Sequence, residues 1–276
     1  MTRERRQLVT GLAALAAATV IFIIPFVYIL FMAAKTKQEA SRLAFSMPAD
    51  WQLWQNFIDV ISARNYMLLL AYFNSTVITV GAVTGLVIFA AMVGYVLQRR
   101  ESKWNRVVYF MVLAGLMIPP AVVPTIWVLQ GLGLFKTISG MILIQIAYGL
   151  SFSILLYRSF IASIPRELDE AAIIDGAKPW QIFFKVVLAL LKPVTVTNIV
   201  VQSIGIFNDF TNPLYYLPGK ENVTVQLTLY NFQSQFLSQF NLLFMNVLLV
   251  TIPPLVVFVF FNRQIVAGMT AGGVKG

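Results

Sequence analysis

The sequence predicts an all-α membrane protein with six transmembrane helices, both termini in the cytoplasm, and a cytoplasmic two-helix loop. Of its 276 residues, 59% are hydrophobic and only 11% are charged, whereas soluble domains are about 45–50% apolar and about 25% charged. The apolar residues also gather into stretches of roughly 20, the length that crosses a bilayer as a helix. The chain therefore lacks the polar residues that would cover a soluble core of this size.

Six stretches meet this length, and five of them contain no charged residue. The fifth in order carries Asp209 alone. None alternates apolar and polar residues as the strands of a membrane barrel do, so all six are predicted as helices. The predicted spans are Val9–Met32, Phe73–Leu97, Val107–Gly131, Ile138–Tyr157, Val194–Leu217 and Phe240–Phe261.

The distribution of basic residues predicts the orientation. Arg3, Arg5 and Arg6 precede the first span, whose apolar stretch is about twice that of a signal peptide, so we expect an uncleaved anchor. With the N-terminus inside, 14 of the 20 Lys and Arg residues face the cytoplasm, in accord with the excess of basic residues on cytoplasmic loops. The six placed outside are Lys35, Lys37, Arg42, Arg64, Lys136 and Lys220.

The missing residue types exclude several functions. With neither Cys nor His, the chain has no thiolate nucleophile, no Cys-ligated zinc and no Ser-His-Asp triad. The net charge of +9 is explained by cytoplasmic loops, so we expect no nucleic-acid partner. We expect no catalytic residue and no metal site, and a single membrane domain over residues 1–276.

The loop at 158–193 carries the most information. Pro165 can start one short helix, with acidic residues in the opening turn where the helix dipole favours them, and Gly176 can end it. Pro179 can start a second helix, whose face bears Trp180, Phe183 and Phe184. An amphipathic hairpin lying on the inner leaflet is the alternative. Against it stand Glu167, Asp169, Glu170 and Asp175, because an anionic leaflet repels such a cluster.

The loop resembles the EAA loop of permease subunits of ABC importers. That pattern is matched at Glu170, Ala171, Ala172 and Gly176, with Asp175 and Ala177 giving the form common in carbohydrate permeases. Ala189 departs from it, because the family usually has Pro there, and we expect a straighter second helix. Further segments resembling sugar permeases are MIPPAVVP at 117–124, GLGLFKT at 131–137, FNDFTNPL at 207–214 and the tail at 263–276.

The resemblance implies a permease that couples to ATPase subunits through this loop. The residues expected to couple are Glu170, Ala171, Ala172, Asp175, Gly176 and Ala177. The C-terminal tail is expected to contact the ATPase subunits through Thr270, Gly272 and Gly273. A frayed polar end is the alternative for this tail. The implied partners are a second permease subunit, two cytoplasmic ATPase subunits that bind ATP and Mg²⁺, an extracytoplasmic solute-binding protein, and membrane lipid. This chain would bind no cofactor itself. The implied location is the bacterial inner membrane.

Polar and proline residues inside two spans are the candidates for the pore. Asp209 is the one ionisable residue within a span, and such residues are functional by default because a mid-membrane charge costs about 2.5–3.5 kcal/mol. A structural role in tying helices together is the alternative. The candidate pore or substrate residues are Asn208, Asp209, Asn212, Pro119 and Pro124.

Three other functions are alternatives to a carbohydrate importer. An importer of a non-sugar solute differs only in its cargo. An independent channel would need rings of polar residues, and a membrane enzyme would need clustered acids or metal ligands. The acidic two-helix loop argues against both the channel and the enzyme, because neither function requires such a loop.

Overall fold

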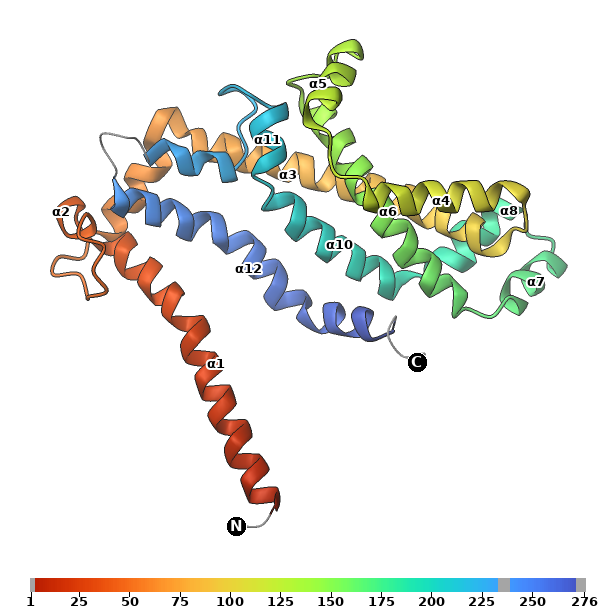
Figure 1. Ribbon diagram of the computed structural model, residues 1–276, viewed down its shortest axis with the longest axis horizontal. Helices are drawn as coiled ribbons and strands as arrows, with labels where there is room; N and C mark the ends of the chain where they lie inside the picture. The colour runs from red at the N-terminus through yellow and green to blue at the C-terminus, as the bar shows by residue number, and fades with distance from the viewer. Residues whose placement is uncertain (1–2, 233–238, 272–276) are drawn as a thin grey trace. The chain divides into compact units, whose positions relative to one another are not determined.

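The computed structural model describes residues 3–232 and 239–271, and within those ranges every regular element is helical (Figure 1). Four helices in this part of the chain are long and apolar enough to cross a membrane, or up to six if each of two bent helix pairs is one span. This confirms the prediction of a helical protein that crosses the membrane several times. The four are α1 (Arg3–Ala34), α3 (Leu53–Arg99), α6 (Ile138–Ala162) and α12 (Phe240–Ala271).

The chain forms two compact units. The first comprises residues 1–69 and 227–252, and includes α1, the short α2 (Lys37–Ala40) and η2 (Gln226–Phe232, from Leu227 onward). Its centre is the buried Asn56, whose side-chain amide donates to the carbonyl oxygens of Ala33 at 2.8 Å and Lys35 at 2.9 Å. Asn241 donates in turn to the Asn56 Oδ1 atom at 2.8 Å. Amide hydrogen bonds thus join the end of α1 to α3 and α12.

The second unit comprises residues 70–226 and 253–276. Two apolar clusters hold it together, one where α3 and α6 meet the second half of the loop, the other toward the opposite ends of the same helices. The remaining helices all lie in this unit: α4 (Lys103–Met117), α5 (Val122–Gly131), α7 (Glu167–Ile174), α8 (Pro179–Gln181), η1 (Ile182–Val187), α9 (Leu188–Leu190), α10 (Lys192–Phe207) and α11 (Thr211–Tyr216).

Helix α3 contains the predicted second span but begins 20 residues before it, at Leu53. Its 47 residues are interrupted at Ala63–Tyr66, where Arg64, Asn65 and Tyr66 have positive φ angles. The element is therefore two helices joined by a left-handed break, and the part from residue 67 to Arg99 carries the apolar span.

The third predicted span, Val107–Gly131, is broken near its middle, at Pro119 and Pro120. The chain bends by 120° between α4 and α5, because Ile118 is extended (φ −79°, ψ 121°) ahead of Pro119 and Pro120. A residue before proline is disfavoured in the helical conformation, and the two prolines supply no backbone donor.

The fifth predicted span, Val194–Leu217, is also broken. Helix α10 ends at Phe207, and α11 follows after Asn208–Phe210. A second bend of 74° separates α8–α9 from α10, and residues 182–187 form a π-helix. This bend lies after the second loop helix, because Pro193 at the start of α10 lacks the N–H that a continuous helix needs. The straighter second helix expected from Ala189 stays a prediction.

Glycines on α3 allow it to approach α6 closely. A Cβ atom added at Gly81 would lie 2.8 Å from the Ile142 side chain. At Gly94 it would lie 3.1 Å from the backbone nitrogen of Arg158 and 3.3 Å from the carbonyl oxygen of Ile154. Because the obstacle at Gly94 is backbone, it cannot be relieved by a rotamer change.

We predict that Gly94→Ala lowers the stability of the protein, by about 1–3 kcal/mol as is typical of overpacking. The matched control is Gly205→Ala in α10, where an added Cβ meets nothing within 4 Å. Thermal unfolding followed by tryptophan fluorescence would show a lower midpoint for the first variant alone. Equal midpoints for the two variants would contradict the close helix approach.

Candidate functional site

The loop between α6 and α10 contains the predicted helix-turn-helix. Helix α7 begins at Glu167, two residues after Pro165, with Glu167, Asp169 and Glu170 in its first turn. After the C-cap Asp175, Gly176 adopts φ +79°. Pro179 then occupies the first turn of α8.

The end of α7 has the geometry of a Schellman motif. The backbone N–H of Ala177 donates to the Ala172 carbonyl at 3.0 Å, and that of Gly176 to the Ile173 carbonyl at 3.0 Å. This motif needs a left-handed residue at the position of Gly176, which glycine adopts without steric penalty. Gly176 therefore fixes the sharp turn between α7 and α8.

The six residues predicted to couple divide by exposure. Ala172 and Ala177 are half-buried and pack against the apolar cluster beneath the loop. Ile173 and Ile174 lie beside the motif and are exposed, Ile174 to 86%. The exposed members of the predicted set are Glu170, Ala171, Asp175 and Gly176. The tip of the loop thus presents an acidic edge with apolar side chains next to it.

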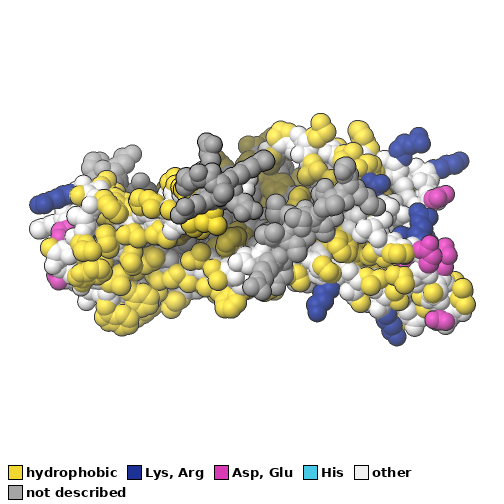
Figure 2. Space-filling model, turned by 90° about the horizontal axis from the view of Figure 1, so that it is seen from below, with side chains coloured by type: hydrophobic (Ala, Val, Ile, Leu, Met, Phe, Trp, Pro, Cys, Tyr) yellow, Lys and Arg dark blue, Asp and Glu magenta, His cyan; other side chains and the backbone are white. Residues whose placement is uncertain are grey.

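Charged side chains concentrate near this loop. Figure 2 shows several basic and acidic groups at the right-hand end of the view, where Figure 1 places α7 and α8. The loop is thus a charged surface of the second unit.

Asp169 does not belong to the exposed edge. It is only 9% exposed and forms an ion pair with Arg99, the last residue of α3. The Arg99 Nε and Asp169 Oδ2 atoms lie 2.7 Å apart. Arg99 also donates from Nη2 to the Ile164 carbonyl at 2.9 Å. Arg166 donates to the Gln98 carbonyl at 3.4 Å. Two arginines thus tie the base of the loop to the end of α3.

The role of Arg99 was missed by the sequence analysis, which counted it only as a basic residue of a cytoplasmic loop. Arg99 and Asp169 lie 70 positions apart, and no local pattern marks either as a partner of the other. Only the packing of α3 against the loop brings them together.

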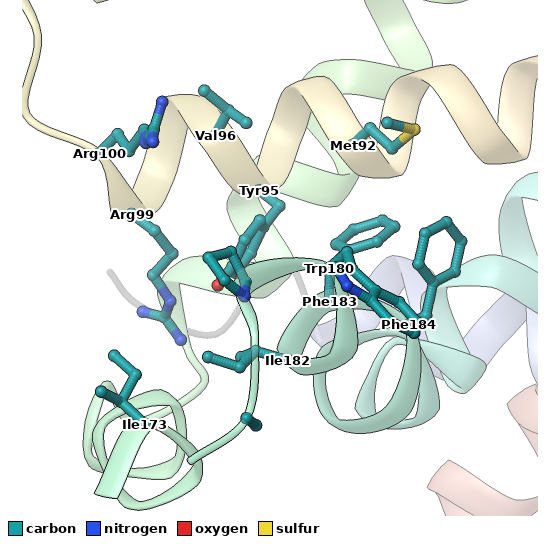
Figure 3. A pocket seen from close by; sticks show the side chains of 12 residues that line it. Met92, Tyr95, Val96, Arg99, Arg100, Ile173, Trp180, Ile182, Phe183 and Phe184 are labelled. Atoms are coloured by element: carbon teal, nitrogen blue, oxygen red, sulfur yellow. The ribbon is translucent and has the colours of Figure 1, made fainter.

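An apolar groove of about 520 Å³ lies between the end of α3 and the loop (Figure 3). Met92, Tyr95 and Val96 line it from α3, and Trp180 and Phe184 line it from α8 and η1. Phe183 is buried beside them and contacts the Tyr95 ring, with the ring centroids 5.5 Å apart. Aromatic packing therefore supports the second loop helix against the same part of α3 that holds Asp169.

The polar residues of the fifth span gather at the break between α10 and α11. Asp209 Oδ2 accepts from the Gln145 side chain at 2.6 Å and from the Asn212 side chain at 2.6 Å, while Oδ1 accepts from the Asn212 backbone at 3.1 Å. These bonds tie α6 to α11. Asn208 lies outside this cluster, is exposed, and accepts from Gln226 at 3.0 Å.

The Asp209 cluster also borders an open cavity of about 480 Å³. Tyr148 and Gln202 line it with Gln145, Asp209 and Asn212. Asp209 therefore joins helices and faces a polar concavity at once. Pro119 and Pro124 do not share this cavity; both are exposed at the bend between α4 and α5.

The predicted ATPase-contacting tail falls at the edge of what the structure describes. Gly272 and Gly273 lie outside the described residues, and Thr270 is described only through its helical backbone in α12.

These features define a multi-pass membrane protein with an exposed acidic two-helix element between two of its spans. Residues 86–271 match the model of the family "Binding-protein-dependent transport system inner membrane component". The chain belongs to this family. Because members are membrane components of transport systems, it is a permease subunit and not an enzyme.

The chain is similar over most of its length to several transport permeases. It is 30% identical to the diacetylchitobiose uptake system permease protein NgcG of Streptomyces coelicolor, covering 98% of this chain and 89% of that protein. It is 31% identical to the melibiose/raffinose/stachyose import permease protein MelC of Bacillus subtilis, covering 98% and 97%. With AmyC of Thermoanaerobacterium thermosulfurigenes, a probable permease for starch degradation products, it shares 33% identity over 93% of each chain.

A solved structure shows the same fold. A chain of a bacterial ABC transporter that imports the acidic polysaccharide alginate matches with a TM-score of 0.83 at 21% identity, covering 95% of this chain and 98% of that one. A second alginate transporter structure, in complex with a periplasmic protein that binds an alginate pentasaccharide, matches with a TM-score of 0.67 at 16% identity, covering 95% and 94%.

We predict that Arg99→Gln loosens the loop, because it leaves the Asp169 carboxylate buried without its cation. Removing one partner of a buried pair costs about 3–5 kcal/mol, and the partial exposure here lowers that figure. Trypsin would then cut faster after Arg166 in the purified protein. Arg100→Gln, which removes the neighbouring exposed guanidinium, should leave the cleavage rate unchanged. Equal rates for wild type and Arg99→Gln would contradict a role of the ion pair in holding the loop.

Proposed function

We propose that this permease subunit forms half of the translocation pore of an ATP-driven carbohydrate importer in the inner membrane of a bacterium. The observation that carries the choice of cargo is the set of relatives that match nearly the whole chain. Their names assign them diacetylchitobiose, melibiose, raffinose, stachyose and starch degradation products. Three relatives that match this chain over at least 93% of its length and are all named for oligosaccharides or starch products support the same substrate class here.

The proposed partners follow from the family. A binding-protein-dependent system delivers its solute from a separate extracytoplasmic protein. A second permease subunit would complete the pore, and two cytoplasmic ATPase subunits would bind ATP and Mg²⁺. Both termini and the α7–α8 loop would then lie in the cytoplasm, as the excess of basic residues on that side supports.

Helix α7 is the proposed contact with an ATPase subunit. Its exposed Glu170 can pair with a basic group of the partner, and Ile173 and Ile174 can enter an apolar cleft, since an exposed apolar pair beside a charge is typical of a docking surface. Gly176 would hold the turn that presents this edge. Thr270, Gly272 and Gly273 remain the proposed second contact.

The contacts of α7 provide a route from the ATPase to the spans. A displacement of α7 is opposed by the Arg99–Asp169 pair and by the hydrogen bond from Arg99 to the Ile164 carbonyl. Arg99 is the last residue of the long helix α3. Closure of the ATPase dimer would therefore move α3 together with the loop rather than bend the loop alone.

We predict that Glu170→Lys leaves membrane insertion intact and abolishes uptake of labelled oligosaccharides by cells or vesicles that contain the complete transporter. The reversed charge would repel the basic partner group, so hydrolysis by the ATPase subunits would no longer drive transport. Glu101→Lys makes the same charge change at an exposed site outside the loop and should transport normally. Normal uptake by Glu170→Lys would contradict the coupling role, whereas wild-type uptake of a non-sugar solute but no oligosaccharide would contradict the cargo.

The polar cavity beside Asp209 is the proposed part of the pore wall that meets the solute. Carboxylate and amide groups hydrogen-bond sugar hydroxyls, and Gln145, Gln202 and Asp209 present such groups to one open concavity. Asn208, Pro119 and Pro124 lie elsewhere. Pro119 is proposed to act through the bend between α4 and α5, and Pro124 lies in the first turn of α5 just after that bend.

We predict that Asp209→Asn raises the KM for oligosaccharide uptake by about tenfold, equivalent to about 1.4 kcal/mol, while the transporter still assembles. An amide keeps the shape of the side chain but offers one acceptor oxygen to the three donors that now surround the carboxylate. The control is Asp50→Asn, an exposed site in the first unit. Loss of assembled transporter would instead support a purely structural role in joining α6 to α11.

A further inference from the structure

A small cavity lies between the first turns of α4 and the last turns of α6. Its volume is about 170 Å³, and it is lined by Leu97, Asn105, Arg106, Tyr109 and Arg158. Two of these five residues carry a guanidinium group. Among the described residues, no carboxylate lines the cavity, so its charge is uncompensated.

Arg158 is held in place but lacks an acceptor. Its guanidinium carbon stacks over the Tyr109 ring, 4.1 Å from the centroid, and its Nε atom is buried with no hydrogen-bond partner in the described part of the chain. Stacking occupies the face of a guanidinium and leaves the N–H groups along its edge available. Buried donors in folded proteins nearly always have a partner, so the arrangement calls for one from outside the chain.

The surroundings favour an anion with several oxygens. Asn105 and Arg106 lie in the first turn of α4, whose N-terminus carries a partial positive charge. Neither Arg106 nor Arg158 forms an ion pair within the described residues. Two guanidinium groups beside a helix N-terminus suit a phosphate group, which can accept bidentate hydrogen bonds.

The position of the cavity indicates where that phosphate comes from. Helix α6 is long and apolar enough to span the membrane, and α4 belongs to one of the bent pairs, so their ends lie at the depth of lipid headgroups. Along α4, Trp104, Val107, Phe110 and Met111 are exposed. These apolar side chains can accept acyl chains that continue from a headgroup held at the cavity, and Trp104, 73% exposed, is a residue typical of the membrane interface.

We propose that Arg106 and Arg158 bind the phosphodiester of an anionic phospholipid, with its acyl chains along α4. The absence of a lining carboxylate among the described residues selects an anionic headgroup such as phosphatidylglycerol over a zwitterionic one, because nothing in the cavity compensates a choline or ammonium charge. The lipid supplies the acceptor that Arg158 lacks. It thereby stabilises the contact between α4 and α6 close to the base of the loop.

The test measures thermal unfolding of the delipidated, assembled transporter with short-chain phosphatidylglycerol, short-chain phosphatidylcholine or inorganic phosphate added. We expect phosphatidylglycerol to raise the midpoint, and Arg106→Gln with Arg158→Gln to weaken its apparent affinity at least about tenfold. The matched control, Arg100→Gln with Lys103→Gln, removes two neighbouring charges that do not line the cavity and should keep the wild-type response.

With the double variant, either of two results would overturn the proposal. An equal response of the cavity variant and the control would exclude these arginines as the site, and an equal response to inorganic phosphate and phosphatidylglycerol would exclude a lipid as the ligand. If the double variant fails to assemble, Arg106→Gln alone is measured, since Arg106 is exposed. Native mass spectrometry should then show fewer retained phosphatidylglycerol molecules per complex than in wild type, and an unchanged number would overturn the proposal.

Discussion

The ion pair between Arg99 and Asp169 is the contact on which the loop geometry depends. It joins the last residue of α3 to the first turn of α7. A largely buried carboxylate is strongly destabilising without its cation. The ion pair therefore favours the position of the loop in which Asp169 contacts Arg99. That position turns Glu170, Ile173 and Ile174 outward while Ala172 and Ala177 pack inward. The same pair joins the acidic edge of α7 to the end of α3, which is the connection that the proposed coupling role requires.

Basic residues near the loop make different kinds of contact, although each adds the same charge to the net charge of the chain. Arg99 neutralises a buried acid, Arg166 bonds a carbonyl of α3, and Arg158 stacks on Tyr109 beside an uncompensated cavity. Basic residues that the sequence analysis counted only as a signal of orientation thus also form specific contacts. The polar cavity near Asp209 is a separate site, because it is built from α6, α10, α11 and Asp209 itself, and shares only α6 with these contacts.

Much of the candidate site was predictable because its signals are local. An acidic first turn, a left-handed Gly176 and Pro179 at a helix start are each explained by backbone geometry over a few residues, and the structure has all three. The approximate positions of the spans were predictable, but the angles of the bends at Pro119, Pro120 and Pro193 were not. Apolar composition measures compatibility with lipid, not continuity of the backbone. The break at Asn208–Phe210 was hidden for the same reason, because α11, which begins at Thr211, continues the apolar stretch on the other side of the break.

The sequence by itself determined the membrane class, the approximate spans and the nature of the loop, because hydrophobicity, charge bias and turn residues act on neighbours along the chain. The tertiary structure alone decided which charged and polar side chains contact one another. It paired Arg99 with Asp169 across 70 positions and Asp209 with Gln145 across 64, and it left Arg158 without an acceptor among the described residues. Such contacts depend on the rotation and packing of whole helices, such as the close approach of α3 to α6 at Gly94, which no local pattern specifies.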